Sequence, residues 1–202
     1  MGEPRFKRRK EQRPGEIADA AFEVFAEKGY ERARVDEVAK RAGVSKGLLY
    51  LYFKTKEALF KAVIKRVVMA RLDSLLVAVE TTELSSEAFI RGPLAGFMKR
   101  VPGSPIAVVI RLLISEGHRH PDLVEYYWEN VVSKGLGAIS QFVERGIERG
   151  EFRRNEVTEQ PQLFIAPMMV SMIWKIVFSK HPLDTDKLIE TQLEMILAFI
   201  KA

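Results

Sequence analysis

Cysteine is absent from the 202 residues of this sequence. The absence excludes disulfide bonds, thiolate metal ligands and thiol nucleophiles together. Long apolar runs are scarce as well: the most apolar segment, residues 163–178, is sixteen residues long and contains Pro167 and Lys175. A membrane-spanning helix needs about 20 predominantly apolar residues, so a membrane span is not predicted.

Catalytic motifs are also missing. The sequence contains no phosphate-binding glycine loop, no HExxH pair, no nucleophile elbow and no distinct pair of carboxylates. The histidines are His118, His120 and His181. A metal site built on the first two would lack obvious further ligands, so a capping or loop role competes with metal binding. We therefore predict neither an enzyme nor a bound metal or cofactor.

Targeting signals are not evident near the N-terminus. Its basic start is like that of a signal peptide, but Asp19 and Glu23 interrupt the apolar stretch that should follow. Phe6 stands where a myristoylation motif requires serine or threonine. These features predict a cytoplasmic protein.

Positive charge is present in excess and is unevenly distributed. The formal net charge is +5; residues 1–60 hold fourteen Lys and Arg against ten Asp and Glu, a net charge of +4, which leaves +1 for the remainder. A hydrophobic fraction of 47% with 29% charged residues is ordinary for a soluble globular protein. The sequence predicts one substantial core, or one core with a small second domain, whose N-terminal part binds phosphate.

Residues 35–56 predict two short helices joined by a sharp turn. Gly43 supplies the chain reversal, and Ser45 is a good N-cap for the second helix. In that helix Leu49 and Phe53 fall on one side, which we expect to be buried. The apolar residues that recur at helical spacing in the first helix are Val35, Val38, Ala39 and Ala42.

The opposite side of the second helix carries Gly47 and Leu51, with Leu48 and Tyr50 beside them and Lys46 at the edge. Such a face is odd for solvent. It suits a helix lying in the major groove of DNA, because small residues allow close approach and apolar residues meet thymine methyl groups.

The remaining pattern is helical, with no convincing strand. The first helix is predicted to start near Pro14 or Gly15 and to end at Gly29, and a long helix to run from Lys56 to about residue 80. Further helices are predicted at 87–100 with an interruption at Pro93, at 105–116, at 121–150 and at 188–200. In the 121–150 helix the small residues that share one stripe, and so indicate a closely packed neighbour, are Gly135, Ala138 and Gly146.

The segment 163–178 is apolar nearly all round. A helix of this kind must be covered on every side, by its own domain and by something else. Its methionines, with Trp128 and Trp174, are either plain core or the adaptable walls of a pocket.

Four segments between Ile17 and Leu59, IADAAFEVFAEKGY, VDEVAKRAGV, SKGLLYLYF and KTKEAL, together resemble the TetR family of bacterial transcriptional regulators. The positions whose residue type matches the motif of this family are Leu49, Tyr50, Phe53, Lys56 and Glu57.

Two sites depart from the family pattern. Ala33 and Arg34 stand where a threonine or serine pair usually precedes the second helix. Without a hydroxyl here, the second helix loses an N-cap and the protein loses a hydroxyl contact to phosphate. The charge of Arg34 could replace that phosphate contact. Leu48 stands where threonine is usual, which removes a hydrogen-bonding group from the groove. The base sequence of the operator therefore cannot be inferred from the resemblance to the family.

The resemblance implies an all-α protein with a basic N-terminal arm (1–13), a three-helix helix-turn-helix DNA-binding domain (14–60) and a C-terminal effector-binding and dimerisation domain (61–202). It implies three partners: a double-stranded DNA operator, a second copy paired through the last two helices, and a small-molecule effector. The residues predicted to bind DNA are Arg34, Ser45, Lys46, Gly47, Leu48, Tyr50, Leu51, Tyr52 and Lys56. The residues predicted to bind a largely apolar effector are Phe97, Trp128, Met168 and Met172, with Arg111 for a polar or anionic group.

Several alternatives stay open at this point. The basic arm is either a solvated tail or a segment that reaches the minor groove or backbone. Lys56 follows the cap Thr55, where the helix dipole disfavours a cation, and is either a surface lysine or the phosphate contact that the resemblance favours.

The predicted function is a ligand-responsive DNA-binding regulator, usually a repressor. The alternative is a helical ligand-binding or interaction protein that no longer reads an operator.

Overall fold

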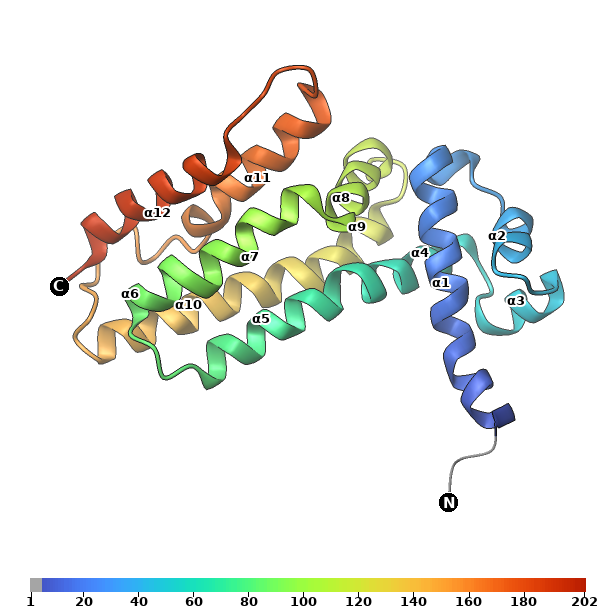
Figure 1. Cartoon of the computed structure of the whole chain (residues 1–202), viewed down its shortest axis with the longest axis horizontal. Helices are drawn as coiled ribbons and strands as arrows, with labels where there is room; N and C mark the ends of the chain where they lie inside the picture. The colour runs from blue at the N-terminus through green and yellow to red at the C-terminus, as the bar shows by residue number, and fades with distance from the viewer. Residues whose placement is uncertain (1–4) are drawn as a thin grey trace. The chain divides into compact units, whose positions relative to one another are not determined.

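The computed structural model describes the backbone of residues 5–202 and the side chains from residue 12 onward (Figure 1). Over this range the chain is built from helices, and the only β-type pairing is an isolated antiparallel bridge between Phe152 and Lys201. The prediction of an all-α fold is confirmed. The side chains of the predicted arm from Arg5 to Lys10 lie outside the described residues.

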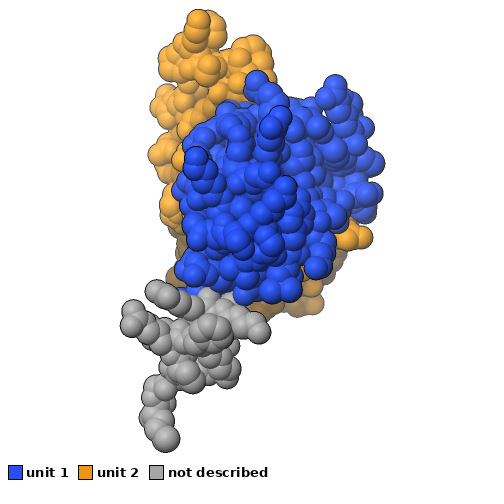
Figure 2. All heavy atoms as spheres, turned by 90° about the vertical axis from the view of Figure 1, so that its right-hand side faces the viewer, with its two compact units in different colours: residues 1–70, 108–127 blue, residues 71–107, 128–202 orange. Residues whose placement is uncertain are grey.

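The chain forms two compact units, coloured separately in Figure 2. The first unit consists of residues 1–70 and 108–127, and the second unit consists of residues 71–107 and 128–202. The sequence placed a boundary after residue 60, which lies inside α4 (Lys56–Ile64). Val63 and Ile64 are fully buried, so the apolar face of α4 continues past that point. Residues 108–127, which the sequence assigned to the C-terminal domain, belong to the first unit.

The first unit is organised around α1 (Arg5–Arg32), which packs against α2 (Val35–Arg41) and α4. α3 (Lys46–Tyr52) packs on α2, and α9 (Pro121–Tyr127) packs on α4. The ring of Phe25 contacts those of Tyr30 and Phe60, with centroids 5.5 and 5.4 Å apart. The most deeply buried side chains of this core are Ile17, Ala21, Val24, Phe25, Val38, Leu49, Leu59, Phe60 and Val63.

Helix α1 starts earlier than predicted, and the predicted end is a kink inside it. The helix begins at Arg5, and Pro14 lies inside it instead of near its first turn. Most of the residues before Pro14 are Arg, Lys, Gln or Glu, good helix formers that outweigh the one backbone hydrogen bond proline cannot donate. Gly29 has φ 77° and ψ 169°, a conformation essentially restricted to glycine, so the regular helix is interrupted by a kink at the predicted glycine and the element continues to Arg32.

The second unit contains α11 (Gln162–Val177) and α12 (Thr185–Ile200), which lie side by side in Figure 1. The sequence predicts that these two helices pair with a second copy of the chain. α12 also packs on α7. None of the described helices combines the length and apolar composition that a membrane crossing requires. The elements of this unit are most of α5 (Ala70–Thr81), α6 (Ser86–Phe89), η2 (Ile90–Leu94), α7 (Ala95–Arg100), η3 (Val101–Gly103), the start of α8 (Pro105–Glu116), η4 (Trp128–Val132), α10 (Ser133–Glu148), α11 (Gln162–Val177) and α12 (Thr185–Ile200).

Helical structure runs from Lys56 to Thr81, as predicted, but it is not uniform. Residues Lys65–Met69 (η1) form a π-helical turn between α4 and α5. The predicted interruption at Pro93 is a second such turn, η2, because proline lacks the N–H that a regular α-helix needs. Side chains beyond each turn are therefore rotated from the positions that a regular α-helix would give them.

The close approach predicted at the small residues of α10 is confirmed at Gly146. A Cβ atom at this position would lie 2.4 Å from Cδ2 of Phe152, whose ring is buried, and 3.0 Å from Oγ of Ser86. At Gly137, on the same helix, a Cβ atom would meet nothing within 4 Å.

We expect Gly146→Ala to lower the free energy of unfolding by about 1–3 kcal/mol, because an added methyl group overpacks a filled site. Gly137→Ala is the matched control and should raise that free energy by up to about 1 kcal/mol, because alanine favours a helix more than glycine does. Urea unfolding followed by circular dichroism measures both. Equal effects at the two glycines would show that contact with Phe152 is not the cause.

Candidate nucleic-acid interface

The turn between α2 and α3 is built as the sequence predicts. Gly43 has φ 63°, a left-handed conformation that a side chain would disfavour. The hydroxyl of Ser45 accepts a hydrogen bond from the backbone N–H of Leu48 at 3.1 Å and so caps α3. Thr55 caps α4 in the same way, accepting from the N–H of Ala58 at 3.0 Å. Both helices therefore begin at positions fixed by local hydrogen bonds.

The two sides of α3 differ as expected. Leu49 is 1% exposed and faces the core of the first unit, whereas Leu51 is 64% exposed. Gly47 and Lys46 are exposed with it, and the flanking residues Leu48, Tyr50 and Tyr52 are half-buried. This leaves a glycine and leucine surface bordered by a cation and tyrosines.

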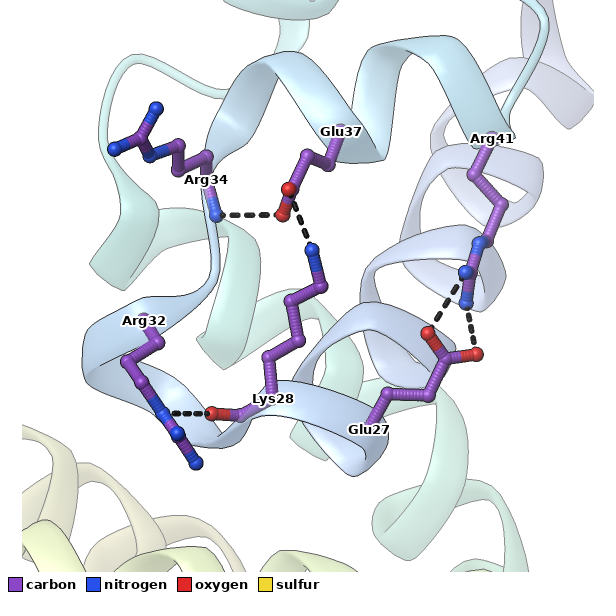
Figure 3. A network of polar contacts seen from close by, with 6 residues as sticks. All are labelled: Glu27, Lys28, Arg32, Arg34, Glu37 and Arg41. Atoms are coloured by element: carbon purple, nitrogen blue, oxygen red, sulfur yellow. Dashed lines mark hydrogen bonds and ion pairs between the residues drawn. The ribbon is translucent and has the colours of Figure 1, made fainter.

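The start of α2 lacks a side-chain cap, as the departure at Arg34 predicts, and Glu37 partly replaces it. The carboxylate of Glu37 accepts a hydrogen bond from the backbone N–H of Arg34 at 3.4 Å and binds Nζ of Lys28 at 2.5 Å (Figure 3). The guanidinium of Arg34 points away from Glu37 in that view and is exposed. Arg34 thus stands at the surface, where a phosphate could reach it.

A second ion pair joins α1 to α2. Arg41 binds the carboxylate of Glu27 through its two terminal guanidinium nitrogens, Nη1 at 2.6 Å and Nη2 at 2.8 Å (Figure 3). The hydrogen bond from Arg41 lowers the pKa of Glu27. Ion pairs from α1 therefore reach both the first and the last turn of α2.

Lys46, at the edge of α3, is held by an acidic neighbour. Its Nζ lies 2.8 Å from Oδ1 of Asp36, and this hydrogen bond raises the pKa of Lys46. Asp36 lies in the first turn of α2, where the helix dipole favours an acidic residue. The pairing depends on how α2 and α3 cross, which no local pattern reports.

Lys56 has a structural role that the sequence did not predict. Its Nζ donates to the backbone carbonyls of Tyr30 and Glu31, each at 3.0 Å, and lies 4.6 Å from the centre of the Tyr30 ring. It therefore caps the carboxyl end of α1, where a cation is favoured. An ammonium group has three N–H donors, so one remains for a phosphate.

The residues predicted to bind an effector fall in different places. Phe97 is half-buried on α7, and Met168 and Met172 are buried on α11, which packs against α7. Trp128 is 49% exposed in η4. Arg111 belongs to the first unit, where its Nη2 donates to the backbone carbonyl of Ala26 at 3.0 Å.

Sequence reasoning missed one polar group on the buried side of α11. Ser171 is 0% exposed, lies between Met168 and Met172 in sequence, and its hydroxyl has no hydrogen-bond partner among the described residues. A buried hydroxyl without a partner is uncommon and costs stability. The only available signal was a single serine in an apolar segment.

Two family models match the chain. One, described as bacterial regulatory proteins, tetR family, matches residues 17–63, and the other, described as tetracyclin repressor-like, C-terminal domain, matches residues 90–191. The second match alone covers 102 of the 202 residues.

Curated relatives include the fatty acid metabolism regulator protein of Bacillus subtilis (strain 168), 29% identical over 147 residues, which are 71% of this chain and 74% of that protein. The HTH-type transcriptional activator FasR of Mycolicibacterium smegmatis is 42% identical over 73 residues, 36% of this chain, and the match spans 33% of FasR.

The fold is shared with the transcriptional regulator FadR from Bacillus subtilis, solved in complex with stearoyl-CoA. The TM-score is 0.74 at 24% identity, with 91% of this chain and 97% of that chain covered. These relatives are regulators of transcription and not enzymes. With its helix-turn-helix and the two family matches, the chain belongs to the TetR family of DNA-binding bacterial transcriptional regulators.

Proposed function

We propose that the protein is a cytoplasmic homodimeric repressor that binds a DNA operator through α3 and releases it when a largely apolar small molecule binds the second unit. The observation that carries operator binding is the outward face of α3, where Gly47 and Leu51 are exposed beside Lys46. An apolar helix face kept at the surface of a basic domain fits the major groove.

The contacts divide into two kinds. Lys46, Leu48, Tyr50 and Leu51 read base edges, and Gly47 lets the backbone approach the groove. The residues assigned to the phosphate backbone are Arg34, Ser45, Tyr52 and the remaining donor of Lys56.

The proposed effector carries a long acyl chain. Met168, Met172 and Phe97 offer flexible and aromatic apolar surface, which suits such a chain. Trp128 adds an exposed aromatic ring in the same unit. Arg111 lies in the first unit and donates to Ala26, so it is not assigned to this site. The stearoyl-CoA bound to the Bacillus subtilis regulator supports this chemical class.

Operator binding is tested by selecting bound duplexes from a random pool and measuring the affinity of the best sequence by fluorescence anisotropy at several salt concentrations. We expect one enriched palindrome with half-sites about one helical turn apart. Enrichment of no sequence would favour the alternative of a helical protein that no longer reads an operator.

Effector release is tested by adding stearoyl-CoA to the complex of protein and selected operator, with coenzyme A alone as the control. Stearoyl-CoA should weaken operator binding, and operator should weaken stearoyl-CoA binding by the same factor. If both compounds leave operator affinity unchanged, the acyl class is wrong. Transcription in vitro decides between repression, which the repressor-like domain supports, and the activation that the name of FasR records.

Asp36 should restrain binding to DNA. We expect Asp36→Asn to raise the affinity for all duplexes and to increase the salt slope by about one counterion, because it frees Lys46 and removes a negative charge beside α3. Asp19→Asn is the matched control, since Asp19 pairs with Arg66 in the same unit and the change in net charge is equal. Anisotropy titrations from low to moderate salt measure both. Identical responses would assign the effect to net charge alone.

A further inference from the structure

His120 lies at a turn whose backbone is fixed on both sides. Its N–H donates to the carbonyls of Glu116 at 3.1 Å and Gly117 at 3.2 Å, so it closes the end of α8. Its carbonyl accepts from the N–H of Leu123 at 3.0 Å, and Pro121 begins α9. The backbone of His120, from which the imidazole ring projects, is therefore held on both sides.

The ring is directed at the carboxyl end of α1. Its Nε2 lies 2.5 Å from Oε1 of Glu31, and its centroid lies 4.7 Å from that of the Tyr30 ring in an edge-to-face arrangement. Lys56 caps the backbone carbonyls of the same two residues of α1. At this end of α1, Lys56 of α4 thus binds backbone carbonyls, and His120 binds the side chain of Glu31.

This contact bears on the DNA-reading surface. The end of α1 carries Lys28 and Glu27, which bind Glu37 and Arg41 of α2, and α2 packs on α3. The contact is made by His120, which falls within the matched C-terminal family domain but within the first compact unit.

We propose that His120 is a positioning residue for the helix-turn-helix, and that its protonated ring, paired with Glu31, holds α1 in the DNA-binding arrangement, so that operator affinity falls as the ring loses its proton. The proposal rests on operator binding as proposed above. It assigns to His120 no contact with DNA.

The charged and titratable groups around the ring fix the sign of the effect. The hydrogen bond to His120, and then the charge of Lys56, lower the pKa of Glu31, so its ionised form is favoured. Burial, and then Glu57 and Glu31, raise the pKa of Tyr30 to about 12, so the phenol stays neutral. Imidazole is the side chain that ordinarily changes charge between pH 5 and 8. Glu31 and Tyr30 of α1 contact the ring directly. Lys56 of α4 and Arg119 of the same turn act on the charge of Glu31, and Glu57 of α4 acts on Tyr30.

A histidine paired with a carboxylate contributes most while it is protonated, and the contribution is lost as pH rises. Because a charge-assisted hydrogen bond is roughly twice as strong as a neutral one, we expect wild-type protein to lose about fivefold more operator affinity than His120→Gln between pH 6 and 8. The slope of affinity against salt should be the same for both proteins, since no phosphate contact changes.

The experiment is anisotropy with the selected operator at pH 6, 7 and 8, on wild type, His120→Gln, Glu31→Gln and the double variant. His118→Gln, two residues away, is the matched control and should keep the wild-type pH profile. The two single substitutions should not add in the double variant, because they remove one interaction. Thermal unfolding at each pH confirms that all variants remain folded.

The proposal would be overturned if His120→Gln kept the wild-type pH profile, or if the effects of His120→Gln and Glu31→Gln were additive. A lower salt slope in His120→Gln would also overturn it, by showing a phosphate contact instead. Failure of the wild-type protein to bind any duplex would contradict the proposed function, and is distinguished from these outcomes because it leaves no pH profile to compare.

Discussion

Phe199→Glu should convert the protein to a monomer and abolish tight operator binding. Phe199 is 60% exposed on α12, one turn from the exposed Met195. On the neighbouring α11 the exposed apolar residues are Leu163, Val170, Ile173 and Val177. Large apolar side chains are thus exposed on both of two packed helices, and exposed apolar surface of this kind marks interaction sites when it is extensive. This surface motivates the proposed pairing with a second copy of the chain.

The expected effect is large because an obligate interface of this kind buries on the order of 2,000 Å² or more, and a carboxylate at its centre would be buried without a partner. A monomer offers one recognition helix where the operator has two half-sites, so operator affinity should fall by about a hundredfold or more.

Light scattering at micromolar concentration and anisotropy with the selected operator measure the two consequences. Val77→Glu is the matched control, because Val77 is 57% exposed on α5, outside α11 and α12, and should leave mass and affinity unchanged. A wild-type protein that is already monomeric at that concentration would refute the interface.

Lys56→Ala should reduce both stability and DNA binding. Removing the ammonium leaves the carbonyls of Tyr30 and Glu31 without their donor and removes a cation from the face of the Tyr30 ring. Because hydrogen bonds to charged groups contribute about 1.5–3 kcal/mol, we expect a loss of about 2 kcal/mol in the free energy of unfolding. The loss of one phosphate contact should also lower the salt slope by about one counterion.

Lys54→Ala is the matched control for charge, because Lys54 is exposed two residues earlier and lies outside the α1 cap. It should lower DNA affinity without lowering stability. Urea unfolding and salt-dependent anisotropy separate the two roles of Lys56. A stability loss in Lys56→Ala with an unchanged salt slope would restrict Lys56 to capping α1 and remove it from the phosphate contacts.

The sequence alone determined the elements of the DNA-reading surface. Gly43, Ser45 and Thr55 act within a few residues of themselves, through backbone conformation or a short hydrogen bond, so their roles follow from chain order. The burial of Leu49 and the exposure of Leu51 follow from the helical repeat. For the same reason the family match rests on a contiguous stretch of sequence.

Only the tertiary structure decided which distant residues complete that surface. Lys56 meets Tyr30 and His120 meets Glu31 through packing that brings separate elements together, and no periodicity encodes such pairs. The first unit takes in residues 108–127 for the same reason. The sequence of a helix shows which of its sides is apolar. Which helix packs against that side depends on how all the helices together bury their apolar surface.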